Sequence, residues 1–266
     1  MPKTATAENV VALEPRPDPA KLLVLLGPQN SGKSLLGRAL VERAREQGRD
    51  PLILDGDRND AYLTALFGKP GAHADEVIGV RRPAYADDAT VKAWLDAEMS
   101  EMEGDGRSRV LDMGGGDLVF PDYAREREIV AMLADARAAI DPVAVHLILP
   151  TVSDLAVLER MEADGLFAPA ATILALNAGP VGDTRPAEVV FRRVRETAIY
   201  RAAIARGARE IVVPTLGCMN LVDDAGLSFE DAMARSSPLG LAHRQMVATF
   251  RRRLYAELDK VASWLP

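Results

Sequence analysis

Eight consecutive residues near the start of the chain combine glycines with a lysine and a hydroxyl side chain. The run spans 27–34 and reads Gly-Pro-Gln-Asn-Ser-Gly-Lys-Ser. It matches the pattern G-x-x-x-x-G-K-[ST] in full, with an apolar strand pattern before it and a helical pattern after it. Glycines let successive backbone N–H groups point into one concavity, and the start of a helix adds a positive partial charge. The run therefore predicts a phosphate-binding loop, or P-loop.

Each part of this loop has an expected role in binding ATP and Mg²⁺, the two cofactors that we predict. Lys33 would bridge the β- and γ-phosphates and so act in catalysis, and the Ser34 hydroxyl would ligate Mg²⁺. The remaining contacts to the nucleotide are expected from the other loop residues: Gly27, Asn30, Ser31 and Gly32.

Two further strand patterns end in aspartate, at 52–57 (Leu-Ile-Leu-Asp-Gly-Asp) and at 110–116 (Val-Leu-Asp-Met-Gly-Gly-Gly). An aspartate that follows an apolar strand beside a P-loop can hold a magnesium-bound water. Glycines just beyond it let the backbone approach a γ-phosphate. We therefore expect catalytic and metal-site roles for Asp57 and Asp112, although a helix cap or turn is the simpler alternative for each. For Asp55, support of the local turn is an open alternative.

A fifth strand pattern ends at Asn177, which is followed by Ala-Gly-Pro. An asparagine side chain offers both a donor and an acceptor, which suits the edge of an adenine ring; a turn residue is the alternative. Pro214, after Ile211-Val212-Val213, is placed in the same way to line a base pocket. The guanine-specific pattern Asn-Lys-x-Asp is not there, so we expect a preference for ATP over GTP.

Apolar strand patterns alternate with helical patterns from Lys21 nearly to the end of the chain, and no repeat is found. The strands are short and apolar on both faces, as in a buried parallel sheet. We predict an α/β fold: a doubly wound, mostly parallel sheet of about six to eight strands, with helices on both faces and the ligand at the carboxyl ends of the strands. The expected strands are 22–26, 51–54, 109–111, 143–149, 171–176 and 211–213, and the expected helices are 34–47, 88–103, 122–139, 153–163, 186–206 and 239–265.

Length and composition set limits on the class of protein. The 266 residues are 48% apolar and 27% charged, which suits one P-loop domain over 21–266 after a flexible leader at 1–20. No apolar stretch is long enough to cross a bilayer and no signal sequence is seen, so we expect a cytoplasmic protein. The single cysteine, Cys218, is expected in the core. The net charge of −7 argues against strong binding to nucleic acid, although the basic cluster 251–253 leaves a DNA or partner contact as the alternative to a solvated face.

Together these residues resemble the ParA/MinD branch of P-loop ATPases, within the larger group that includes the signal-recognition GTPases. The resemblance covers 21 to about 260 and rests on the P-loop, on Asp57, on Asp-Met-Gly-Gly at 112–115, on Asn177 and on Pro214. It implies that Asp57, 24 positions after Lys33, orients the attacking water and that Asp112 is the switch II aspartate. It also implies that Asn177 and Pro214 contact adenine.

A narrower resemblance is to the plasmid-borne TraL, MobD and StbC group of ParA-like proteins. The run 111–121, Leu-Asp-Met-Gly-Gly-Gly-Asp-Leu-Val-Phe-Pro, is similar to their Asp-Asn-Gly-Ala-Ser-x-Phe-x-Pro pattern. This resemblance implies a weak ATPase that acts as a switch in plasmid transfer, mobilisation or partition, together with a protein partner.

One position departs from the ParA pattern, whose loops read G-K-G-G-x-G-K-[ST]. The extra lysine of that pattern crosses a homodimer interface to the partner's phosphates, and here its place is taken by Pro28. The ATP-bound homodimer is therefore in question. Two other functions stay open: a small-molecule P-loop kinase, with 81–83 (Arg-Arg-Pro) as its lid, and a nucleotide-binding adaptor that does not hydrolyse.

Overall fold

The structure is a computed structural model that describes residues 19–58, 60–70, 77–134, 140–182 and 185–266. The expected leader at 1–20 lies outside the described residues except for Pro19 and Ala20, and Ala20 already begins the first strand. Within the described ranges, no helix is long and apolar enough to cross a membrane.

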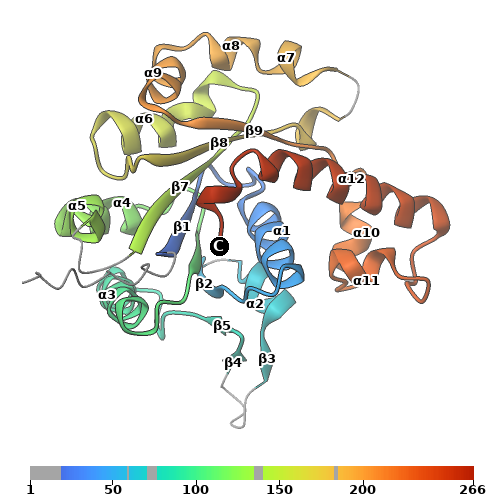
Figure 1. The fold of residues 1–266 in the computed structure, drawn as a ribbon, viewed down its shortest axis with the longest axis horizontal. Coiled ribbons are helices and arrows are strands. Elements are labelled where there is room, and N and C mark those ends of the chain that lie inside the picture. The colour runs from blue at the N-terminus through green and yellow to red at the C-terminus, as the bar shows by residue number, and fades with distance from the viewer. Residues whose placement is uncertain (1–18, 59, 71–76, 135–139, 183–184) are drawn as a thin grey trace, which may run out of the picture.

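A seven-stranded sheet runs through the middle of the molecule, in the order β5-β2-β6-β1-β7-β8-β9 (Figure 1). Every pair of neighbouring strands in it is parallel, which confirms the predicted α/β class. All six expected strands are present, with bounds that differ by a few residues. The strands of this sheet are β1 (Ala20–Leu26), β2 (Leu52–Gly56), β5 (Val80–Arg81), β6 (Arg109–Met113), β7 (Ile140–Ile148), β8 (Ala171–Asn177) and β9 (Arg209–Val213).

The sequence analysis missed three short strands, because two residues are too few to show a period. The edge strand β5 pairs with β2. The other two, β3 (Lys69–Pro70) and β4 (Val77–Ile78), form a separate antiparallel pair, which Figure 1 shows beyond the edge of the main sheet.

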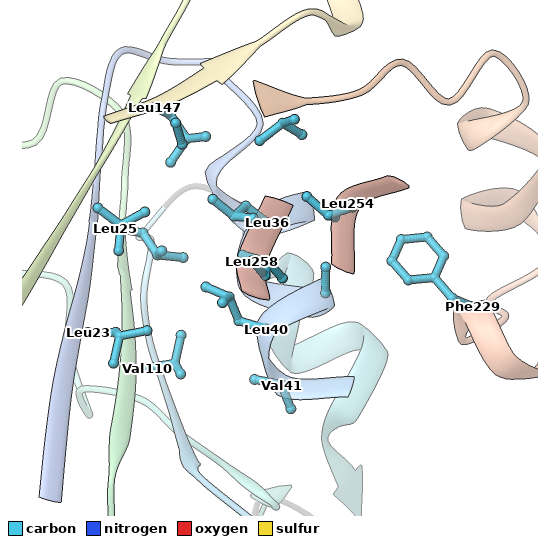
Figure 2. Packing of buried hydrophobic residues seen from close by; sticks show 14 of the residues in the cluster. Leu23, Leu25, Leu36, Leu40, Val41, Val110, Leu147, Phe229, Leu254 and Leu258 are labelled. Carbon is cyan, nitrogen blue, oxygen red and sulfur yellow. The ribbon is translucent and has the colours of Figure 1, made fainter. Parts of the chain in front are cut away.

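Apolar side chains cover both faces of the sheet, as a doubly wound fold requires. On one face, Leu23 and Leu25 of β1 pack with residues of α1 (Lys33–Glu46) and α12 (Leu241–Asp259), as Figure 2 shows. On the opposite face, Leu22 and Val24 pack with α3 (Asp88–Asp105), α4 (Val119–Arg127) and α5 (Ile129–Ala134). Cys218 is buried in the first of these clusters, as expected.

Helices α1 and α3 follow the expected ranges closely, whereas the other four expected helices are shorter or broken. The expected helix at 122–139 splits into α4 and α5 at Glu128, whose φ of 45° is left-handed and ends a helix, and its last part, 135–139, lies outside the described residues. The expected helix at 186–206 is three: α7 (Ala187–Val190), α8 (Arg192–Arg195) and α9 (Ala198–Arg206). Thr197 explains the last break, because its hydroxyl accepts a hydrogen bond from the Tyr200 N–H and caps α9.

The remaining helices complete the layers around the sheet. The expected helix at 153–163 is a 3₁₀ turn (Val152–Leu155) followed by α6 (Ala156–Ala163), and the expected C-terminal helix ends at Asp259. The sequence analysis missed α2 (Tyr62–Phe67), α10 (Met219–Asp224) and α11 (Phe229–Met233), each of six residues or fewer. Figure 1 shows α10 and α11 beside α12. Two of these missed helices contribute to the site.

Candidate functional site

The predicted P-loop connects the central strand β1 to the first turn of α1. Gly32 has a φ of 90°, and a Cβ there would lie 2.6 Å from Asn177 Nδ2. Gly27 has a φ of 150°, and a Cβ there would lie 2.8 Å from the backbone oxygen of Leu147. Both positions therefore need glycine for conformation and for space. Asn30 also has a positive φ, of 58°, which asparagine tolerates better than most residues.

Lys33 lies beneath this loop and is only 6% exposed. Its Nζ donates hydrogen bonds to the backbone oxygens of Gly27 at 3.3 Å and Pro28 at 3.0 Å. Burial lowers the pKa of Lys33, and the nearby carboxylates of Asp112 and Asp57 oppose that shift. The ammonium group is thus held by the backbone of the loop and has two acidic side chains near it.

Ser34 and Asp112 are joined by a short hydrogen bond. The Ser34 hydroxyl donates to Asp112 Oδ2 at 2.6 Å. The other oxygen, Oδ1, is buried without a hydrogen-bond partner among the described residues. Burial raises the pKa of Asp112 to about 7, against the hydrogen bond from Ser34 and the charge of Lys33. A divalent cation beside this pair would supply the missing partner and favour the ionised carboxylate.

Asp57 lies across from the P-loop, at the end of β2. Its Oδ1 accepts a hydrogen bond from the Asp60 N–H at 3.1 Å. The loop after β6 contacts both sides of the site: a Cβ on Gly114 would lie 3.1 Å from Asp57 Oδ1, and a Cβ on Gly115 would lie 2.4 Å from Gln29 Cα. These two glycines therefore allow the loop to approach the P-loop and Asp57 at once, as a switch loop must.

Asp55 binds Thr64 of α2. It is buried, and its Oδ2 accepts hydrogen bonds from the Thr64 N–H at 2.9 Å and the Thr64 hydroxyl at 2.6 Å. Burial raises the pKa of this carboxyl group. Asp55 thus anchors α2 to the end of β2, which agrees with the supporting role that the sequence analysis left open for it.

Asn177 lies under the P-loop and is 6% exposed. Its Nδ2 donates to the Ser31 backbone oxygen at 2.7 Å, and its Oδ1 accepts from the Gly179 N–H at 2.8 Å. The side chain therefore holds the P-loop in place. The expected contact of Asn177 with adenine stays a prediction. The same holds for Pro214, which follows β9 and does not line the cavity over α1.

A cavity of about 380 Å³ opens over the first turn of α1. The P-loop residues 29–34 line one side, together with Asp57 and Gly115 from the two facing loops. The sequence analysis missed the other side, which is formed by Asp60, Tyr62, Met219 and Asp223 together with Leu35. Most of these residues come from the short helices α2 and α10, and no local pattern marks them.

Behind the cavity, a fully buried arginine joins four helices. Arg38, one turn after Ser34 in α1, donates to Glu42 Oε1 at 3.0 Å, to the Tyr62 hydroxyl at 3.0 Å and to Asp223 Oδ1 at 3.2 Å. It also donates to the backbone oxygen of Leu227. Glu42 in turn accepts hydrogen bonds from the backbone N–H of Phe229, the first residue of α11. Arg38 therefore positions α2, α10 and α11 around α1.

The arginines of the β2 and β5 loops are bound within the chain. Arg58 donates from Nε to Asp117 at 3.0 Å and from Nη1 to Asp88 at 2.9 Å. These bonds connect the loop after β2 to the loop after β6 and to α3. Arg81 pairs with Glu98 and Glu101 of α3, and Arg82 donates to the backbone oxygen of Asp57 at 2.9 Å. Among the described residues, no group of three or more His, Cys, Asp or Glu side chains is arranged to hold a metal ion.

No protein-family model matches this chain, and no curated protein does. Among solved structures it is similar to the MinC:MinD cell division protein complex of Aquifex aeolicus, with 15% identity over 90% of this chain and 97% of that chain and a TM-score of 0.46. It is also similar to FlhF complexed with GMPPNP and Mg²⁺, with 14% identity, 76% and 67% coverage and a TM-score of 0.41.

A third similar structure is the signal recognition particle receptor FtsY of Elizabethkingia anophelis. The identity is 12% over 88% of this chain and 65% of that chain, and the TM-score is 0.39. At these identities and scores, the three similarities carry no argument about the site. The assignment of the fold therefore comes from this structure, which has an all-parallel sheet flanked by helices and a P-loop between its central strand and the following helix.

Proposed function

We propose that this chain is a Mg²⁺-dependent ATP-binding switch protein that hydrolyses ATP slowly. One observation carries the proposal: Lys33 and Ser34 line an open cavity, and Ser34 is hydrogen-bonded to Asp112, whose Oδ1 is buried without a partner among the described residues. A hydroxyl and a carboxylate are oxygen ligands of the kind that Mg²⁺ prefers. A lysine and the start of α1 favour a polyphosphate in the same place.

Each residue at this end of the cavity has a task in the proposed reaction. Lys33 would exchange its bonds to the loop carbonyls for bonds to the phosphates, and the loop N–H groups would bind the remaining phosphate oxygens. Ser34 and Asp112 would hold the cation, directly or through water, and the cation would offset charge on the phosphates. Asp57 would orient the attacking water, which needs position more than basicity in a loose transition state.

We also propose that a protein partner controls closure of the site. Pro28 has neither charge nor N–H, so it cannot replace the cross-subunit lysine of ParA-type loops. Arg58, the residue after Asp57, is bound to Asp117 and Asp88 of its own chain. The proposed role in plasmid transfer, mobilisation or partition rests on the sequence resemblance alone. Identifying the genes that flank this one tests that role directly.

Calorimetry and steady-state turnover together test the proposed function. Wild-type protein is expected to bind ATP with Mg²⁺, to prefer ATP to GTP, and to release phosphate slowly with water as the only acceptor. Lys33→Ala is expected to abolish ATP binding, whereas Asp57→Ala is expected to bind ATP nearly as well as wild type and to hydrolyse it at least tenfold more slowly. Lys260→Ala, which removes an exposed lysine of the C-terminal segment, is the control for loss of a positive charge.

Other outcomes select among the alternatives. Undiminished ATP affinity in Lys33→Ala would overturn the site assignment. Binding without any turnover favours a nucleotide-binding adaptor, and turnover that requires an added acceptor favours a small-molecule kinase. The kinase would also need another lid, since Arg81 is held by Glu98 and Glu101.

A further inference from the structure

The far side of the cavity differs in chemistry from the P-loop side. Met219 and Asp223 are four residues apart in α10, so they lie on one face of that helix, and both line the cavity. Leu35, the residue after Ser34, lines it as well. This side therefore presents the apolar side chains of Met219 and Leu35 together with the Tyr62 ring and the carboxylates of Asp60 and Asp223, and no cation is among its lining residues. It suits a group that is uncharged and carries hydroxyls.

The carboxylate of Asp223 is fixed through one of its two oxygens. Oδ1 accepts the Tyr62 hydroxyl at 2.7 Å and Arg38 Nη1 at 3.2 Å. Oδ2 accepts no hydrogen bond from any described residue, and the side chain is 36% exposed. Burial raises the pKa of Tyr62 to about 12, which keeps its hydroxyl protonated as a donor to Oδ1. Asp223 is thus oriented by two donors and keeps an acceptor for a ligand.

Asn177, which the sequence predicts to contact the base, already makes two hydrogen bonds within the chain. Asn177 uses Nδ2 to hold Ser31 and Oδ1 to accept from Gly179. Neither Asn177 nor Pro214 lines the cavity, so the cavity itself offers another surface for the sugar and base of a bound nucleotide. The α10 face is the other end of the same cavity, reached from the P-loop across Leu35.

We propose that α10 forms the nucleoside subsite of this protein: Asp223 Oδ2 accepts hydrogen bonds from the ribose hydroxyls, and Met219 with Leu35 packs against the base. The proposal rests on the proposed nucleotide-binding function and adds the residues that recognise the nucleoside. A carboxylate repels phosphates, so this placement also sets the direction in which the nucleotide lies, with phosphates at the P-loop and sugar at α10. Thioether and aliphatic side chains suit the face of a base ring.

Calorimetry in Mg²⁺ with four ligands tests the subsite: ATP, 2′-deoxy-ATP, 3′-deoxy-ATP and inorganic triphosphate. A hydrogen bond to a charged acceptor predicts that wild-type protein binds ATP about tenfold more tightly than at least one of the deoxy forms. In Asp223→Asn an amide N–H₂ stands where a carboxylate oxygen was, so we expect ATP and the deoxy forms to bind within about twofold of each other. The affinity for inorganic triphosphate is expected to stay that of wild type.

Asp224→Asn is the matched control, because it removes the neighbouring exposed carboxylate of α10, which does not line the cavity. It is expected to keep the wild-type preference for ATP. Met219→Ala is a second variant that leaves the Arg38 contacts in place, and it is expected to weaken ATP several-fold without changing the affinity for inorganic triphosphate.

The results separate this proposal from the proposed function. If wild-type protein binds ATP but does not distinguish it from either deoxy form, the ribose contact is wrong and the P-loop assignment stands. If Asp223→Asn and Met219→Ala both keep wild-type affinities and discrimination, the nucleoside lies elsewhere and the subsite is overturned. If wild-type protein binds neither ATP nor triphosphate, the proposed function itself fails.

Discussion

The two ends of the cavity are built in opposite ways. The P-loop end comes from eight consecutive residues, whose glycines and lysine set the conformation and charge locally. The α10 end is assembled from distant segments, and its central ion pair joins Arg38 to Asp223 across 185 positions of sequence. A pattern search finds the first kind of site and misses the second, although both line the same cavity.

The two ends also differ in how their buried polar groups are satisfied. At the P-loop end, Ser31 Oγ and Asp112 Oδ1 are buried without hydrogen-bond partners among the described residues. So are both ring nitrogens of His146, which pairs in register with Leu26, the last residue before the loop. At the α10 end, Arg38 is fully buried and has four partners. Unsatisfied groups at a site are expected where a ligand completes the set.

The largest predicted effect is on the α10 end. Arg38→Met is expected to lower the free energy of unfolding by about 3–5 kcal/mol, because it leaves the charge of Glu42 buried without its partner. Burial already raises the pKa of Glu42, and Arg38 is the main opposing influence. Urea unfolding followed by circular dichroism measures the change.

The control for Arg38 is Arg45→Met, which breaks an exposed pair with Asp50 and is expected to cost less than about 1 kcal/mol. The double variant Arg38→Met with Glu42→Gln is expected to recover part of the loss. A cost for Arg38→Met as small as that of the control would mean that the network does not hold α2, α10 and α11 on α1.

A smaller effect is predicted at His146 of β7, and it depends on pH. Burial lowers the pKa of His146 to about 3. Between pH 6.5 and pH 3 the unfolded chain therefore binds a proton at this position that the folded chain does not, so stability falls as the pH falls. The slope is at most about 1.4 kcal/mol per pH unit, or about 2 kcal/mol between pH 6.5 and pH 5.

The His146→Leu variant tests this contribution, with urea unfolding at several pH values as the measurement. It is expected to be at least as stable as wild type at pH 7, because it removes two unsatisfied nitrogens, and to lose less stability on acidification. His243→Gln, which lacks a partly exposed histidine of α12, is the control for loss of a histidine. Parallel curves for His146→Leu and wild type would contradict the assignment.

The same contrast explains how much could be predicted from the sequence. The strand patterns predicted the parallel sheet, because β1 and β8 are apolar at most positions, and the P-loop pattern located Lys33 and Ser34. Ser34 and Asp112 were each predicted at the metal site, and the structure brings them together because Asp112 lies near the carboxyl end of β6, which pairs with β1. Tyr62 and Met219 were missed, since helices of six residues show too little periodicity and their place depends on Arg38.

The smallest predicted effect concerns the subunit state, where the P-loop end departs from the family that it resembles. A lysine that crosses a dimer interface adds a charge-assisted contact worth roughly 1.5–3 kcal/mol, or about ten- to a hundredfold in dimer affinity. Pro28 cannot supply it, and Arg58 would have to give up Asp117 and Asp88 in order to reach a partner's phosphates.

We therefore expect ATP to leave the subunit state of the Asp57→Ala protein unchanged at low micromolar concentration. Light scattering with and without ATP and Mg²⁺ measures the mass of this variant, which should keep its nucleotide. A tight ATP-induced dimer of this protein alone would contradict the expectation and show that Pro28 is no obstacle. Arg58→Ala in the same background then tells whether Arg58 makes the contact, because loss of the dimer would mean that its ion pairs with Asp117 and Asp88 open when ATP binds.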